Sequence, residues 1–305
     1  MGLLGETKPV KKPILGVSLY PEQETMEEIE NYLTMASHYG FTKIFTSMFS
    51  VPGTKEEVFD YFKNFCDLAH KHGMKVSGDC NTAFLKKMGA SESDISIFKE
   101  MGIDIIRMDL PYFDQRDVTL INNPYNITIE LSSCMIQAVR MALENGANPK
   151  NFSTCHNFYP ERYTASDLES IREVNKELSN LGIPSAVFIS SNEENTHGPW
   201  PVHDGLPTVE DHRWIPAELQ VRHWIAVGDV DEIIFGNAFA SEEEFKAIDK
   251  VMKEAYVNIP KLVGQDYLAE LLPHGEVERV PFKVVLDDGV TDLEKEILFD
   301  SVYHQ

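Results

Sequence analysis

The sequence predicts an α/β protein in which eight parallel strands close into a (β/α)8 TIM barrel. Eight short apolar, β-rich runs each end in polar residues, and amphipathic helical segments follow them. Strands that alternate with helices form a parallel sheet, because each helix returns the chain to the start of the next strand. Eight such units within 305 residues favour a closed barrel over an open sheet.

The expected strands follow one another at helix-length intervals along the chain. They begin near Ile14, Phe41, Met74, Ile103, Tyr125, Phe152, Ile183 and Val230. The fourth connection is short, from Tyr112 to Pro124, so we expect its helix to be short or irregular. The seventh connection, from Asn192 to Gly228, is the longest. Long loops on a barrel usually serve the active site.

Helix boundary signals support this order. Three Ser/Thr and Glu pairs have capping-box spacing and predict helix starts: Thr25 with Glu28, Thr54 with Glu57, and Ser241 with Glu244. Glycines stand where helices should end before the next strand, at Gly40, Gly73, Gly102, Gly146 and Gly182. After a helix near Glu242–Tyr256 the rhythm stops. We therefore expect a catalytic barrel over residues 1–256 and an incomplete, small β-rich unit over 257–305.

Composition excludes several classes of partner. The net charge of -22 repels polyanions, which argues against nucleic acid and against a polybasic membrane contact. No apolar run reaches the about 18 residues that a membrane span needs. The four cysteines form no CxxC pair, so we expect free thiols and a cytoplasmic protein. Nothing in the sequence indicates the oligomeric state.

Polar residues gather where the predicted strands end, which is where barrel active sites lie. Side chains alternate along a strand, so residues of one parity point into the barrel. The candidates at or just beyond the strand ends are Ser18, Tyr20, Thr46, Asp79, Asn81, Arg107, Asp109, Thr128, Glu130, His156, Asn157, Tyr159 and Asn237. They predict a polar catalytic mouth.

Asp109 and Glu130 end adjacent strands, and we expect them to face one open cup as the catalytic pair. Two carboxylates are the minimum apparatus for glycoside hydrolysis. Arg107 precedes Asp109 on the same face, and a nearby cation favours the ionised form. Asp109 should then stay charged while Glu130 supplies the proton. Asp79 is a rival for either role, and a purely structural Arg107–Asp109 ion pair is the alternative reading.

The seventh connection carries the segment ENTHGPWPVHDGLPTVEDHR, which has three possible uses. It could recognise an anion, since barrel phosphate sites favour the loops after strands seven and eight. It could hold a metal ion through His203, Asp204 and His156, although that spacing matches no familiar metal motif. It could also be a solvated loop whose histidines cap turns. Its substrate-binding candidates are His197, Gly205, Thr208, His212 and Arg213.

Other chemistries lack their residues. Lys43 and Lys75 stand near the starts of their strands, so a Schiff-base aldolase would lack its amine. No GxSxG elbow and no GxGxxG dinucleotide motif occurs. We therefore expect an enzyme without a cofactor.

Several segments together resemble the signature segments of the bacterial 6-phospho-N-acetylmuramidases, some of which are labelled outer surface proteins. The segments are LGVSLYPEQ (15–23), FTSMFS (45–50), RMDLPY (107–112), IELSS (129–133), CHNFYPERYT (155–164) and HGPWPVHDGLPTVEDHR (197–213). The resemblance covers the whole predicted barrel. It implies a TIM barrel followed by a small cyclophilin-like domain.

The resemblance also implies an activity, which is cleavage of the β-1,4 bond of MurNAc 6-phosphate–GlcNAc in peptidoglycan recycling. Asp109 and Glu130 stand in matching segments and remain the expected catalytic pair. Two alternatives stay open: a metal-dependent sugar-phosphate isomerase or hydrolase on the same barrel, and a non-catalytic protein that binds phosphorylated sugars.

Overall fold

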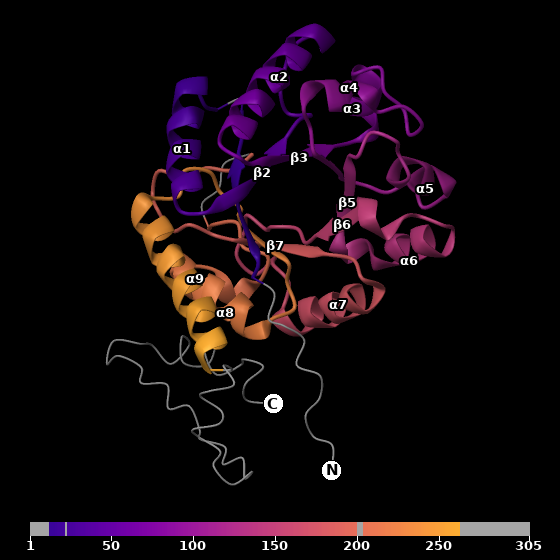
Figure 1. Ribbon diagram of the computed structural model, residues 1–305. Helices are drawn as coiled ribbons and strands as arrows, with labels where there is room; N and C mark the ends of the chain where they lie inside the picture. The colour runs from indigo at the N-terminus through magenta and orange to yellow at the C-terminus, as the bar shows by residue number, and fades with distance from the viewer. Residues whose placement is uncertain (1–11, 22, 200–203, 263–305) are drawn as a thin grey trace, which may run out of the picture.

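The strands form a closed parallel barrel, as the sequence predicts. The computed structural model describes residues 12–21, 23–199 and 204–262 (Figure 1). The strands follow chain order around the barrel, and β8 pairs with β1 to close it. Their bounds are β1 (Ile14–Leu19), β2 (Phe41–Ser47), β3 (Lys75–Cys80), β4 (Ile105–Met108), β5 (Thr128–Ser132), β6 (Phe152–Cys155), β7 (Ser185–Ile189) and β8 (Glu232–Phe235).

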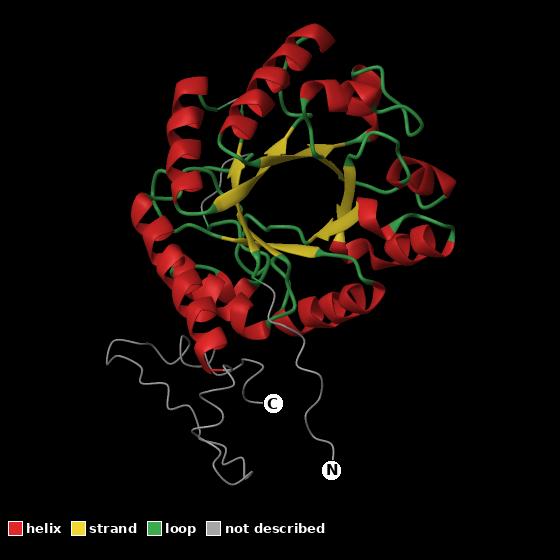
Figure 2. Cartoon of the chain, in the orientation of Figure 1, coloured by secondary structure: helices red, strands yellow, loops and turns green. Residues whose placement is uncertain are grey.

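Helices form an outer ring around the strands (Figure 2). They are α1 (Met26–His38), α2 (Lys55–Lys71), α3 (Thr82–Lys87), α4 (Ser96–Met101), α5 (Gln115–Ile121), α6 (Ile136–Glu144), α7 (Leu168–Leu181), α8 (Ala217–Val227) and α9 (Glu242–Leu262). Short 3-10 turns cover Ser133–Met135, Pro149–Asn151 and Glu210–His212. The helix of the fourth unit, α5, is short, as expected.

The predicted capping signals are present. Thr25 and Thr54 each form a reciprocal capping box with the glutamate three residues later. Ser241 and Glu244 exchange the same pair of hydrogen bonds at the start of α9. The five expected helix-end glycines all have positive φ, a conformation that costs glycine little. These local signals fix where the helices begin and end.

Apolar side chains on the outer strand faces pack against the helices. Phe245 of α9 meets Phe41 of β2 and Phe235 of β8 edge-on, with ring centroids 4.6 Å and 5.8 Å away. All three rings are buried, and burial of each such side chain contributes roughly 1.5–3 kcal/mol. This contact holds the last helix against the seam where the barrel closes.

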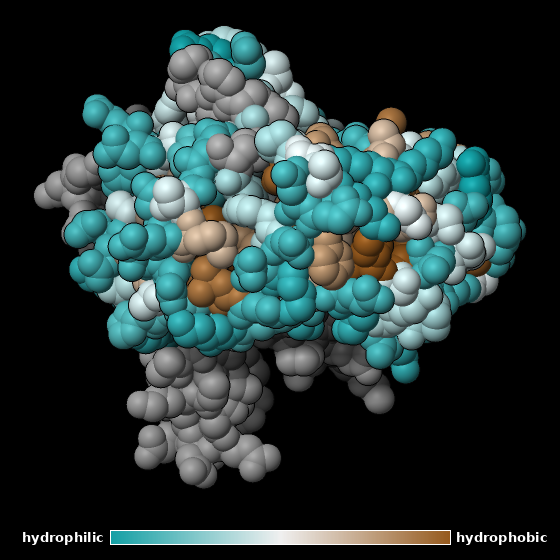
Figure 3. Space-filling model, turned by 90° about the horizontal axis from the view of Figure 1, so that it is seen from above, coloured by the Kyte–Doolittle hydropathy of each residue, from teal (hydrophilic) through white to brown (hydrophobic). Residues whose placement is uncertain are grey.

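Helix α9 continues to Leu262, past the expected domain boundary at residue 257. The expected β-rich unit over 257–305 otherwise falls outside the described residues. No helix among the residues that the structure describes is long and apolar enough to cross a membrane. The face seen in Figure 3 is largely hydrophilic, and its apolar side chains lie in small separate patches.

Candidate active site

An arginine at the end of β4 organises the mouth of the barrel. Arg107 Nη1 donates to Asp79 Oδ1 at 3.0 Å, and Nη2 donates to Asn157 Oδ1 at 2.5 Å. Ser132 Oγ also donates to Asn157 Oδ1, at 3.2 Å. Strands β3, β4 and β5 and the residues just after β6 therefore converge on one polar cluster, which includes the candidates Asp79, Arg107 and Asn157.

Asp79 is the perturbed acid of this cluster. Burial raises the pKa of its carboxyl group, the Arg107 guanidinium opposes that rise, and the charges of Asp109 and Glu130 add to it. Burial is the largest of these effects, so the pKa of Asp79 is raised on balance. A carboxyl group with a raised pKa keeps its proton to a higher pH than a free aspartate does, which suits a general acid.

Asp109 lies beside Asp79 but is open to water. Its backbone N–H donates to the Cys80 carbonyl at 2.9 Å, which continues the β3–β4 ladder beyond the strands. The side chain is exposed. Arg107 pairs with Asp79, so the alternative of a structural Arg107–Asp109 ion pair is not what the structure has. Strand register explains this, because Asp79 stands directly opposite Arg107.

Glu130 does not face an open cup with Asp109, contrary to the expectation. It is fully buried and accepts from Lys43 Nζ at 2.9 Å, and Lys43 also donates to Glu232 at 2.5 Å. Ser77 and Ser153 hydroxyls lie 3.4 Å from its carboxylate. We expected Glu130 at the mouth because of its position in the strand. That position does not show that Lys43 of β2 hydrogen-bonds to its side chain.

The Lys43 network lies toward the opposite end of the barrel. Lys43, Ser153 and Glu232 line a cavity of about 340 Å³ at the amino ends of the strands. Burial lowers the pKa of Lys43, but the two carboxylates outweigh that effect and raise it. Lys43 is thus a charged side chain that two carboxylates engage from below the mouth. This agrees with the expectation that Lys43 stands near the start of its strand.

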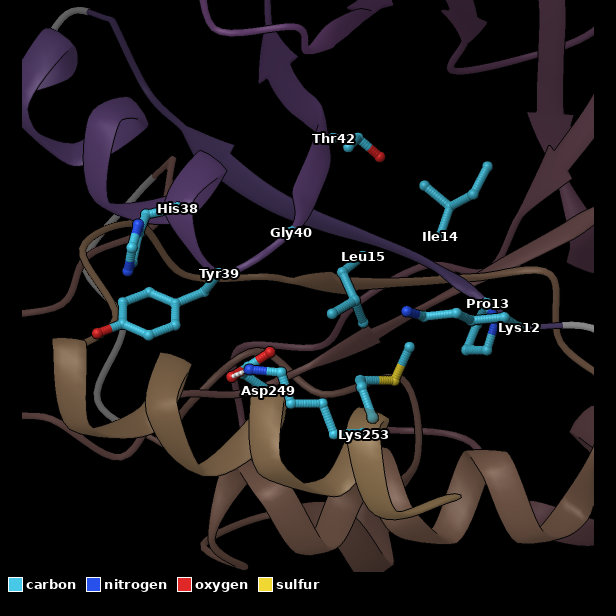
Figure 4. A pocket seen from close by; sticks show the side chains of 11 residues that line it. Lys12, Pro13, Ile14, Leu15, His38, Tyr39, Gly40, Thr42, Asp249 and Lys253 are labelled. Carbon is cyan, nitrogen blue, oxygen red and sulfur yellow. Dashed lines mark hydrogen bonds and ion pairs between the residues drawn. The ribbon is translucent and has the colours of Figure 1, made fainter. Parts of the chain in front are cut away.

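A second cavity of about 490 Å³ also lies away from the acids, among residues at the start of β1, the end of α1 and one face of α9. Figure 4 shows His38 and Tyr39 on one side of it, with Asp249 and Lys253 of α9 on the other. It contains none of the candidates that the sequence suggested.

Three candidates near β1 and β8 use their polar groups to hold the barrel together. Ser18 Oγ donates to the Phe235 carbonyl at 2.6 Å, and Tyr20 Oη donates to the Gly236 carbonyl at 2.5 Å. Asn237 exchanges hydrogen bonds with the backbone of Ser191 and contacts Thr196. All three are buried. Their polar groups are engaged within the protein, and their expected part in substrate binding stays a prediction.

His156 points away from the mouth. Its Nε2 lies 2.8 Å from Asn175 Oδ1 of α7, so the ring sits between the strand and the helix layer. Burial lowers its pKa to about 4. Asp204 pairs with Arg162 at 3.0 Å, so this residue and His156, two ligands of the metal alternative, each have another partner, and His203 lies outside the described residues. Among the described residues, no group of three or more His, Cys, Asp or Glu could hold a metal ion.

The seventh connection is internally braced. Arg213 donates to both oxygens of Glu210 and to the Tyr159 and Asp204 carbonyls, and it lowers the pKa of Glu210 to about 2. His212 is buried against His223, with 2.7 Å between ring nitrogens. These two expected anion donors are therefore occupied by the protein itself.

Two further candidates position the loops. Thr208 Oγ1 donates to the Asn157 carbonyl and accepts from the Phe188 N–H. Gly205 has a positive φ of 81°, which its lack of a Cβ permits. Together they hold the seventh connection next to the backbone of Asn157.

Sequence reasoning missed Glu24 and Ser132. Ser132 has inward parity and could have been found from the strand pattern. Glu24 lies beyond β1, outside the positions that parity addresses, and its importance depends on a contact with His197. That contact joins residues far apart in the chain, and no local signal shows it.

Residues 15–250 match the family model described as 6-phospho-N-acetylmuramidase, N-terminal. The chain belongs to this family. The match includes Asp79, Arg107, Asp109 and Asn157, so the polar cluster lies inside the 6-phospho-N-acetylmuramidase domain. The expected family resemblance is confirmed.

Solved structures share the fold of this 6-phospho-N-acetylmuramidase domain. An uncharacterized B. cereus protein is 36% identical with a TM-score of 0.69, over 78% of this chain and 65% of that one. A conserved Enterococcus faecalis protein of unknown function is 22% identical with a TM-score of 0.68, over 80% and 66%. The chain thus spans about two thirds of each of these proteins. No curated protein matches it.

Proposed function

We propose that the chain hydrolyses the β-1,4 bond of MurNAc 6-phosphate–GlcNAc, releasing the two sugars during cytoplasmic peptidoglycan recycling. The observation that carries the proposal is the cluster of Asp79, Arg107 and Asp109 at the mouth of a barrel from this family. Active sites of such barrels lie at this end. The four free thiols agree with a reducing compartment.

The two aspartates have environments suited to different steps. Asp79, whose pKa is raised by burial, would protonate the glycosidic oxygen as GlcNAc leaves. Asp109, which is exposed, would act at the anomeric carbon, directly or through a water molecule. Glycosidases use two carboxyl groups in these complementary ways. The proposal replaces Glu130 with Asp79 as the proton donor.

Arg107 carries a donor, Nε, that no described residue uses. The side chain is only 6% exposed, and its Nε has no hydrogen-bond partner among the described residues. Buried polar groups normally have a partner. A substrate oxygen would have to enter this enclosed space to satisfy the group, while Arg107 keeps its bonds to Asp79 and Asn157.

The proposal is tested by incubating the protein with MurNAc 6-phosphate–GlcNAc, with the unphosphorylated disaccharide, and with EDTA. We expect cleavage of the phosphorylated compound, little cleavage of the other, and no effect of EDTA. No cleavage of either disaccharide would favour a non-catalytic sugar-binding protein. Loss of activity with EDTA, restored by a divalent metal, would favour the metal-dependent alternative.

A further inference from the structure

A buried glutamate holds a histidine above β1 and β8. The Glu24 side chain is 1% exposed, and its Oε1 lies 2.9 Å from His197 Nε2. Both Glu24 oxygens also accept from the Tyr20 backbone N–H, at 3.0 and 3.1 Å. Burying a carboxylate is costly unless it is hydrogen-bonded. This one accepts from the Tyr20 N–H and is paired with His197, and these contacts fix its position.

The contact with Glu24 determines how the His197 ring can be used. An ionised carboxylate only accepts hydrogen bonds, so Nε2 carries a proton. The other ring nitrogen, Nδ1, has no hydrogen bond to a described residue, and 29% of the side chain remains exposed. When protonated, Nδ1 can donate to a ligand. Fixing one ring nitrogen to orient the other is a common use of such pairs.

Three loops converge on this pair. Gln23 Nε2 donates to the Gly198 carbonyl at 2.7 Å, which joins the loop after β1 to the seventh connection. His197 forms a β-bridge with Ala238 after β8. The His197 ring stacks on Phe239, with centroids 5.6 Å apart, and Phe239 has a positive φ of 65°. Bulky residues rarely adopt this conformation, and such strain gathers at functional sites.

We propose that His197, oriented by Glu24, donates to the phosphate of a sugar 6-phosphate. The inference rests on the proposed function and names the residues that select its phosphorylated substrate. Barrel phosphate sites lie at the loops after strands seven and eight, where His197 stands. A protein of charge -22 needs a local donor to attract an anion.

The other cationic side chains described in the seventh connection are occupied. Arg213 is engaged by Glu210 and two carbonyls, and His212 is buried against His223. Among the histidines described in the seventh connection, His197 is partly exposed and has one ring nitrogen, Nδ1, without a hydrogen bond to a described residue. Glu24 is a positioning residue, because it reaches the ligand only through the ring.

Calorimetric binding of MurNAc 6-phosphate and of MurNAc tests the proposal without requiring turnover. We expect the intact protein to prefer the phosphorylated sugar. His197→Gln should reduce that preference at least tenfold, and Glu24→Gln severalfold. Glu27→Gln removes an exposed carboxylate from the same segment and should leave the preference unchanged. In turnover assays His197→Gln should raise KM and leave kcat nearly intact.

An unchanged preference in folded His197→Gln, or no preference in the intact protein, would overturn the inference. If Glu24→Gln fails to fold, the histidine variant alone decides. Cleavage with an unaffected preference would leave the proposed function standing and remove the phosphate site. A His197-dependent preference without any cleavage would support the phosphate site and contradict the proposed function.

Discussion

Buried charge within the barrel is divided between two clusters. Lys43 joins Glu130 and Glu232 in the lower interior, and Arg107 joins Asp79 at the mouth. The lower cluster is closed to solvent apart from the Glu232 side chain, which is 14% exposed. The upper cluster lies near an exposed acid, Asp109, and contains the Arg107 Nε donor, which has no partner in the part of the chain that the structure describes. Similar residue types therefore stabilise the fold in the lower cluster and are available for chemistry in the upper cluster at the mouth.

Glu130 should matter for stability more than for chemistry. Removing one partner of a buried ion pair leaves an uncompensated charge and costs about 3–5 kcal/mol. Because Lys43 keeps Glu232, we expect Glu130→Gln to lower the free energy of unfolding by about 3 kcal/mol. Urea denaturation measures this. The folded variant should keep a near-normal kcat, and a thousandfold loss of kcat at unchanged stability would restore Glu130 as the acid.

His156 predicts a pH dependence of folding. Its pKa is lowered by burial from 6.5 to about 4, so the native state favours the neutral ring. This stabilisation is complete above pH 6.5 and is lost as the pH falls toward 4, with a magnitude of about 3 kcal/mol. Urea denaturation at pH 7 and pH 4 should show a smaller loss in His156→Gln than in the wild type. His38 is exposed, and His38→Gln should lose as much stability between pH 7 and pH 4 as the wild type does. An equal loss in the wild type, His38→Gln and His156→Gln would contradict this account.

At the scale of elements, hydrogen bonds hold the seventh connection in a defined position at the mouth of the barrel. Its contacts with Tyr159, Asn157 and Ser190 tie it to the ends of β6 and β7. Gly205 permits the close approach of this connection to Ser190. Its φ is positive, and a Cβ there would collide with Ser190 Oγ, the atom that accepts from the Leu206 N–H at 3.0 Å.

Gly205→Ala should therefore be more harmful than the same change at a comparable glycine. Gly182 also has a positive φ, but a Cβ there would meet nothing within 4 Å. Left-handed backbone alone costs a non-glycine residue about 1–2 kcal/mol, and overpacking adds about 1–3 kcal/mol. Urea denaturation should show the larger loss for Gly205→Ala. Equal losses would mean that the loop relaxes without penalty.

At the scale of the whole molecule, the barrel could be predicted because its signals are local. Alternating strands and helices, capping boxes at Thr25 and Thr54, and glycine at helix ends each depend on a few neighbouring residues. The eight predicted strands all occur. The short α5 and the long seventh connection were visible for the same reason.

The site could be predicted only in part, because pairing across the barrel is not local. Strand-end parity placed Asp79, Arg107 and Asp109 at the mouth. It could not show that register sets Arg107 against Asp79, or that Lys43 reaches Glu130 from another strand. It also could not show that His156 turns toward Asn175. These outcomes depend on the three-dimensional positions of residues distant in sequence.

The central claim is that Asp79 and Asp109 carry the hydrolysis, and kcat for MurNAc 6-phosphate–GlcNAc tests it most directly. Each step of general acid–base catalysis typically contributes about 10²–10⁴-fold. We predict losses in this range for the folded fraction of Asp79→Asn and of Asp109→Asn, and none for Asp60→Asn on the exposed face of α2. Asp79→Asn should also lower the free energy of unfolding, because it leaves the buried Arg107 without its ion-pair partner. Near-normal kcat in folded Asp79→Asn would contradict the account.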